Sequence, residues 1–112
     1  MNDLTVLKEV RSLIETGWTQ DVLARSEEGI QCDPEDEDAV SWCLTGAIRR
    51  AIWQFPSLPG RPLYSLRIEL VLRAAAGGSK IKSLVLFNDA PGQTKDTVLD
   101  LIDRAIEIEG RR

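Results

Sequence analysis

The sequence predicts a mainly α fold, with about four helices around one core and a small β-hairpin after the first helix. Apolar residues recur at helical spacing in four segments, and stretches rich in glycine, proline or acidic residues separate these segments. Between the first two segments the helical periodicity is lost, which favours strands there. Since 112 residues are enough to bury one core, we expect a single domain over residues 1–112.

Composition is ordinary for a soluble globular protein, with 43% hydrophobic and 29% charged residues. No apolar run reaches the roughly 20 residues that a membrane-spanning helix needs. The first residues, "MNDLTVLKEV", lack the basic start and apolar run of a signal peptide. We therefore expect a cytoplasmic protein that does not contact membranes, with Cys32 and Cys43 reduced.

The charge balance and the absence of histidine narrow the possible functions. The net charge is −4, and basic residues are mixed with acidic ones along the chain. Direct nucleic-acid binding requires a basic face, so we expect none. Histidine is the commonest general base and metal ligand, and the chain contains none. We therefore expect no cofactor, no metal and, on balance, no enzymatic activity.

The first helix is predicted over residues 4–16, where apolar residues repeat every three or four positions. Asp3 is a candidate cap, and Gly17 is a candidate stop. After this helix, residues 19–25 and 30–32 read as the two strands of the hairpin, with the turn at Glu28-Gly29. A short helix over Gln20 to Arg25 is the alternative.

An acidic segment precedes the second helix, which is predicted over residues 34–54. Asp33 would cap this helix, and Pro34 would occupy its first turn, beside acidic residues that favour a helix N-terminus. A calcium loop is excluded because its glycine and distal glutamate are misplaced. A solvated helix start is the preferred interpretation; a cation site or an acidic nucleic-acid mimic is the alternative.

The stretch "AVSWCLTGAI" reads as the middle of this second helix. Val40, Leu44, Ala47, Ile48 and Ala51 would share one face, and Trp42, Gly46, Arg49 and Trp53 would share the opposite face. In one interpretation both faces are covered and Gly46 allows another element to approach closely. In the other, the exposed Trp42, Arg49 and Trp53 anchor a protein interface, because Trp and Arg are frequent anchors.

Cys43 is expected to be a small buried hydrophobe rather than a nucleophile. A nucleophilic cysteine needs a lowered pKa and a nearby base. The acidic residues upstream would raise the pKa of the Cys43 thiol, and in a helix over 34–54 it would lie beyond the first turn.

The C-terminal half contains two further predicted helices with a strand-length apolar run between them. The third helix begins near Leu63 and ends at Gly77-Gly78, with a stripe of Leu63, Leu66, Leu70 and Ala74 that Ile68, Val71 and Leu72 widen. The run "KSLVLFND" is short enough to be a strand. Thr94 caps the last helix, "KDTVLDLIDRAIEIEG".

Three stretches, "GWTQDVLAR", "AVSWCLTGAI" and "FNDAPGQTKDTVLDLIDRAI", resemble a small uncharacterised domain family of bacteria and their phages. The family pattern combines Trp-x-Gln, Cys-x-x-Gly-Ala and aromatic-Asn-Asp motifs. Phe87 stands where tryptophan is common, and Glu28-Gly29 stands where Asp-Gly is expected. The resemblance implies a shared fold without an assigned reaction. The matching positions are Trp18, Gln20, Cys43, Gly46, Asn88 and Asp89.

Two hypotheses explain these shared positions. In the first, Asn88 and Asp89 hold the turn before the last helix through hydrogen bonds to nearby backbone. In the second, Trp18 and Trp42 form the walls of a shallow pocket in which Gln20, Asn88 and Asp89 contact a small polar ligand or a peptide.

The function predicted from these observations is that of a non-enzymatic protein-interaction or regulatory module with a protein partner. The alternative is a small-ligand-binding domain or weak enzyme, with a pocket near Trp18, Gln20, Cys43 and Asp89. No sequence feature specifies the oligomeric state.

Overall fold

The computed structural model describes residues 3–56, 61–78 and 81–112. These residues form five helices and one two-stranded antiparallel sheet, which confirms the mainly α class but gives one helix more than predicted. In chain order the elements are α1 (Asp3–Thr16), β1 (Ala24–Ser26), β2 (Ala39–Trp42), α2 (Leu44–Trp53), α3 (Arg61–Ala75), α4 (Leu84–Asp89) and α5 (Lys95–Gly110).

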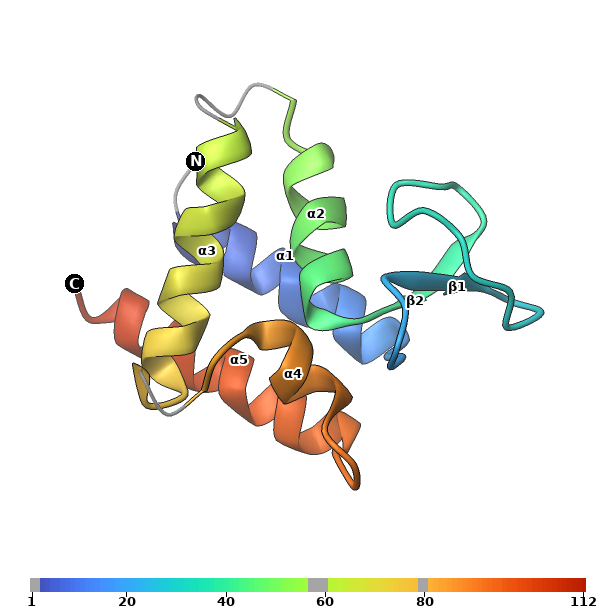
Figure 1. The fold of residues 1–112 in the computed structure, drawn as a ribbon. Coiled ribbons are helices and arrows are strands. Elements are labelled where there is room, and N and C mark those ends of the chain that lie inside the picture. The colour runs from blue at the N-terminus through green and yellow to red at the C-terminus, as the bar shows by residue number, and fades with distance from the viewer. Residues whose placement is uncertain (1–2, 57–60, 79–80) are drawn as a thin grey trace.

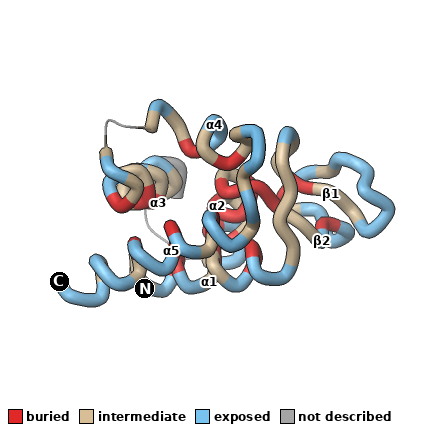
Figure 2. The backbone as a smooth tube through the Cα atoms, turned by 90° about the horizontal axis from the view of Figure 1, so that it is seen from below, coloured by how far each residue is buried: buried red, intermediate tan, exposed pale blue. Residues whose placement is uncertain are grey.

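The helices pack around α1, which lies against both α2 and α5 (Figure 1). Helices α2 and α3 stand side by side, and the small sheet projects at the end of the molecule opposite the two termini. Figure 2 shows the buried backbone concentrated where α1, α2, α3 and α5 meet. The fully buried aliphatic side chains come from all five helices, and they include Leu7, Ile14, Leu44, Ile68, Leu72, Leu84 and Ile102.

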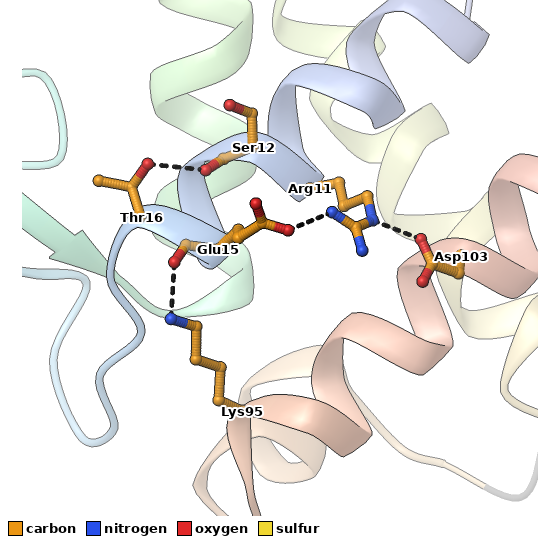
Figure 3. Close-up of polar contacts among 6 residues, drawn as sticks. All are labelled: Arg11, Ser12, Glu15, Thr16, Lys95 and Asp103. Atoms are coloured by element: carbon orange, nitrogen blue, oxygen red, sulfur yellow. Dashed lines mark hydrogen bonds and ion pairs between the residues drawn. The ribbon is translucent and has the colours of Figure 1, made fainter.

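Helices α1 and α5 form where the sequence predicts them. The Thr94 side chain caps α5 by accepting a hydrogen bond from the Thr97 amide, at 3.2 Å. Arg11 of α1 joins the two helices by donating to Asp103 of α5 at 2.5 Å, and it also pairs with Glu15 (Figure 3). The hydrogen bond to Asp103, followed by the one to Glu15, raises the pKa of Arg11 above its usual range.

The predicted hairpin is confirmed only in part. Residues 24–26 and 30–32 are joined by an antiparallel bridge between Arg25 and Gln31, with backbone hydrogen bonds from Ser26 to Ile30 at 2.8 Å and from Cys32 to Ala24 at 3.0 Å. The main partner of β1 is β2, in the register Ala24↔Trp42, and neither strand nor helix covers the whole of 19–25. The alternative of a helix over residues 20–25 is wrong, because Ala24 begins a strand.

The acidic segment forms turns instead of the start of a helix. The Asp33 side chain accepts from the Glu35 amide at 2.9 Å, and the Asp36 side chain accepts from the Asp38 amide at 2.8 Å. Aspartate side chains that bond two residues ahead stabilise turns, and here they compete successfully with helix capping. The chain is therefore free to enter β2 at Ala39.

Helix α2 begins at Leu44, ten residues later than predicted, with Cys43 as its N-cap. Trp42 consequently lies at the end of β2 and not on the helix. Val40, expected on the buried helical face, is exposed on β2. The strand forms because Trp42 bonds across to the segment after α1: its amide donates to Gly17 at 3.0 Å, and its carbonyl accepts from Thr19 at 3.2 Å.

The apolar stripe predicted for the third helix is not the face that α3 buries. Ile68, Leu72 and Ala75 pack into the core, whereas Leu63 and its neighbours on the stripe face outward. Positive φ angles at Gly77 and Gly78 accompany the end of this helix, as predicted. The proline-rich break and the "GGSK" stretch include residues 57–60 and 79–80, which lie outside the described residues.

The apolar run "KSLVLFND", which is short enough to be a strand, instead forms the short helix α4. The Ser83 side chain caps α4 by accepting from the Leu86 amide at 3.0 Å.

Within the ranges that the structure describes, no helix is long and apolar enough to cross a membrane.

Candidate functional site

Asn88, at the end of α4, is fully buried and joins three separate segments. Its Oδ1 accepts from the indole nitrogen of Trp18 at 2.8 Å and from the amide of Leu44 at 3.1 Å. Its Nδ2 donates to the Thr19 carbonyl at 3.1 Å and to Asp89 at 2.9 Å. These four bonds use both donors and both acceptor positions of the amide.

Gln20 and Asp89 extend this arrangement, which we call the Asn88 network: Trp18, Gln20, Asn88 and Asp89. Gln20 Nε2 donates to the carbonyls of Asn88 and Ala90, at 3.0 and 3.2 Å. Asp89 Oδ1 also accepts from the amide of Asp21 at 3.0 Å, where Asp21 has a positive φ of 74°. The network therefore fixes the loop after α1 against the end of α4 and the start of α2.

The structure thus brings together the residues of the Trp-x-Gln and Asn-Asp motifs, which are about seventy positions apart in the sequence. Their contacts are with one another and with backbone groups. A buried amide with four protein partners contributes to a specific fold and offers no free hydrogen-bonding group to a ligand. This geometry favours the architectural hypothesis for Asn88.

Cys43 and Gly46 lie at the start of α2, close to this network. Cys43 is buried and its Sγ accepts from the Gly46 amide at 3.3 Å. Burial raises the pKa of the Cys43 thiol, outweighing the lowering effect of the nearby backbone amides. A Cβ atom added at Gly46 would stand 2.0 Å from the carbonyl oxygen of Leu23. Another segment of the chain therefore approaches Gly46 closely, as one of the two interpretations of the sequence predicts. The group next to Gly46 is a backbone carbonyl.

The three residues expected to share an exposed interface face differ in their exposure. Trp42 is buried, and its indole donates to the Pro34 carbonyl at 3.1 Å. Trp53 is exposed near the end of α2, and Arg49 lies 3.8 Å from Asp33. Sequence reasoning missed Arg50, whose guanidinium lies 5.5 Å from the Trp42 ring centroid and 5.3 Å from that of Trp53. Arg50 lies three residues before Trp53, and on a helix this spacing indicates that the two side chains can be in contact.

Metal-binding groups do not gather in the part of the chain that the structure describes. No set of three or more Cys, Asp or Glu side chains is placed there so that it could hold a metal ion.

A second region stands out because it exposes large apolar side chains along most of α3. The exposed fractions are 74% for Leu63, 51% for Leu66 and 50% for Leu70. Together with Ala74 these residues follow a spacing of three, four and four, which places them on one stripe about 16 Å long. Exposed apolar surface arranged contiguously is typical of a binding site.

The stripe borders an apolar groove of about 470 Å³ between α3 and the C-terminal half of α5. Both ribbon views place these two helix segments beside each other (Figure 1, Figure 2). Ile108 of α5 is also exposed, on the opposite wall from the leucines. The described lining residues are Leu63, Leu66, Arg67, Leu70, Val71, Ala74, Ala75, Ala105, Ile108, Glu109 and Arg112. We call this the α3–α5 groove.

A polar contact fixes α3 beside the start of α1. Tyr64 and Arg67 both donate to the Asp3 carboxylate, at 2.9 and 3.0 Å. Burial, and then the hydrogen bond to Asp3, raises the pKa of Tyr64 to about 12. These contacts hold α3 in the orientation that turns its leucine stripe to solvent.

The groove was not among the sites expected from the sequence, although its leucines were identified as an apolar stripe. Helix α3 is apolar on two sides, and periodicity alone does not tell which side packs. The signal available in the sequence was the width of the apolar surface, which exceeds what one packed face requires.

Comparison with known families matches residues 1–108 to a family of unknown function, DUF6197. The match spans nearly all of the chain, so the protein belongs to this family. No curated protein and no solved structure matches the chain significantly.

Proposed function

We propose that this DUF6197 member is a non-enzymatic protein-interaction module of bacterial or phage type that acts in the cytoplasm and binds its partner in the α3–α5 groove. The observation that carries the proposal is the exposed leucine stripe of α3. Fully burying an exposed leucine side chain contributes roughly 1.5–3 kcal/mol. Leu66 and Leu70 are already half buried, so each would contribute about half of that when a partner covers the stripe.

The form of the groove favours a protein partner over a small ligand. Small-molecule pockets bury most of their ligand's surface and combine an apolar wall with converging polar groups. Here the apolar side chains lie along an open ridge that extends over three helical turns. In helix-in-groove recognition an amphipathic helix lays its apolar face along an elongated apolar surface of this kind.

The Asn88 network supports the alternative function, a ligand pocket, less well than the α3–α5 groove supports a protein interface. The donors and acceptors of Asn88 are already bonded to Trp18, Leu44, Thr19 and Asp89. A polar ligand that entered there would first have to break these bonds, and leaving buried polar groups unpaired is costly.

Site-specific photo-crosslinking in cells of the source organism tests the proposal. A photoreactive phenylalanine derivative replaces Leu66 in the groove or, as a matched control, Leu86, which is exposed on α4 and does not line the groove. We expect a discrete adduct with another protein from position 66 and none from position 86. Equal labelling at the two positions, or no adduct at position 66, would contradict the proposal.

A further inference from the structure

The charged side chains that border the α3–α5 groove are unevenly exposed. Arg67 is paired with Asp3 at 3.0 Å, and Arg112 is paired with Glu109 at 3.3 Å. The side chains of the two arginines are 66% and 73% exposed, whereas those of Asp3 and Glu109 are only 12% and 11% exposed. Solvent at the rim therefore meets guanidinium groups, although the whole chain carries a net charge of −4.

A third arginine adds to this cationic rim. Arg104 of α5 is exposed and donates to the carbonyl of Ala75, a lining residue of the groove, at 3.3 Å. Arg67 comes from α3, Arg104 comes from α5, and Arg112 lies just beyond the end of α5, so cations border the groove on both of its sides. Among the described lining residues, Glu109 is the one carboxylate, and Arg112 pairs with it.

The cationic rim also argues against a second copy of this chain as the occupant. In a two-fold symmetric dimer the same patch faces itself, so two grooves would bring their arginine rims together. Like charges opposed across an interface weaken association and favour a partner of opposite charge. A partner that complements this surface therefore carries exposed carboxylates next to apolar anchors.

This inference rests on the proposed function and specifies its partner. We propose that the α3–α5 groove binds an amphipathic helix whose apolar ridge is flanked by Asp or Glu. The ridge packs along Leu63, Leu66 and Leu70, and the carboxylates pair with Arg67, Arg104 and Arg112. The apolar contacts supply affinity, whereas the charges at the rim select the partner and increase the association rate.

Selection from a displayed library of helical peptides, each about four turns long, tests the partner's chemistry. Peptides are selected on the wild-type protein in the presence of excess soluble Leu66→Ser, which removes those that bind elsewhere. A parallel selection with excess Leu86→Ser is the matched control, because Leu86 is similarly exposed but lies on α4. We expect enriched peptides with leucine-like residues spaced by three and four positions, next to Asp and Glu.

The best peptide is then compared with a version in which its Asp and Glu are replaced by Asn and Gln. We expect the neutral peptide to bind roughly threefold to tenfold more weakly to the wild type at low salt, the range for a few exposed ion pairs, and added salt to reduce the difference. Arg112→Gln should reduce the discrimination. A thermal melt of each variant verifies that the fold is intact.

The outcomes separate this inference from the proposed function. Groove-binding peptides without an acidic preference, or with a basic one, would overturn the partner's charge and leave the interaction module standing. A peptide that binds in the groove is competed away by soluble wild-type protein but not by soluble Leu66→Ser. If the selection yields no such peptide, both proposals are wrong. Concentration-dependent dimerisation that Leu66→Ser abolishes and Leu86→Ser does not would make a second copy the occupant and overturn this inference.

Discussion

The indole nitrogen of Trp18 donates to Asn88 Oδ1 at 2.8 Å, across 70 positions of sequence. This bond joins the segment after α1 to the end of α4, and the same oxygen accepts from the first amide of α2. One buried side chain thus sets the relative positions of three elements. It also brings a tryptophan and an asparagine that are far apart in the sequence into direct contact.

The first prediction concerns this side chain. We expect Asn88→Ala to lower the free energy of unfolding by at least about 2 kcal/mol, because each buried polar group that loses its partner costs roughly 1–3 kcal/mol. Chemical denaturation measures the change. Gln93→Ala is the control: the Gln93 side chain makes two bonds, to the Phe87 carbonyl and from the Thr94 amide, against four for the fully buried Asn88, so its loss should cost less. A stability for Asn88→Ala equal to that of the wild type would contradict the architectural role.

The second prediction concerns Gly46, whose added Cβ would lie 2.0 Å from the Leu23 carbonyl oxygen. The neighbour is backbone and moves only if β1 shifts, so we expect Gly46→Ala to destabilise by about 1–3 kcal/mol despite alanine's better helix propensity. At Gly110 of α5 an added Cβ meets no atom within 4 Å, so Gly110→Ala should be neutral or slightly stabilising. Thermal melts of the two variants measure both effects, and equal midpoints would disprove the close contact.

The third prediction concerns the two thiols. Burial is the largest factor raising the pKa of both Cys32 and Cys43 above the ordinary value of 9.0, so both thiols should react slowly at neutral pH. Cys43 is buried in the N-cap of α2, whereas Cys32 is half-buried. We expect mass spectrometry after treatment with iodoacetamide to find Cys32 modified first. Prior labelling of Cys43 would contradict this order and restore the case for a reactive site.

The fourth prediction concerns Tyr64, the only tyrosine in the chain. Its pKa is raised from 10.0 to about 12, so the folded state favours the neutral phenol. The stability that depends on the neutral phenol, through burial and through the hydrogen bond to Asp3, is therefore complete below pH 10 and is lost as the pH rises from 10 towards 12. Absorbance at the phenolate band should show ionisation near pH 12, and Asp3→Asn should lower that pKa. Circular dichroism at each pH monitors folding. An unshifted wild-type pKa in folded protein would contradict the burial of Tyr64, and an unchanged pKa in Asp3→Asn would contradict the Tyr64–Asp3 contact.

The sequence predicted the elements whose local signals agree with their tertiary contacts. In α5, the Thr94 cap and the apolar positions of one face coincide with the observed helix and its buried residues. In residues 33–42, local and tertiary preferences differ. The pattern Asp33-Pro34 suits a helix start, but the Asp33 side chain stabilises a turn and Trp42 bonds to Gly17, so the segment becomes turns and a strand.

The candidate sites could be predicted only in part, for the same reason. Motif resemblance grouped Trp18, Gln20, Asn88 and Asp89, but sequence does not show that the amide of Asn88 has four protein partners. The leucine stripe of α3 was recognised as apolar, but which face packs depends on where α2 and α5 lie. Burial of Ile68 instead of Leu66 is a tertiary outcome that periodicity does not encode.

Chemical-shift mapping tests the central claim, that the partner binds in the α3–α5 groove, most directly. The ¹⁵N-labelled protein is titrated with the best acidic peptide from the selection, and the amide shifts are compared with those of free protein. We predict that the largest shifts fall on Leu63 to Ala74 and on Ile108 to Arg112, while those of Trp18, Gln20 and Asp89 stay small. Largest shifts at Trp18, Gln20 and Asp89, with α3 unaffected, would contradict the account and place the site at the Asn88 network.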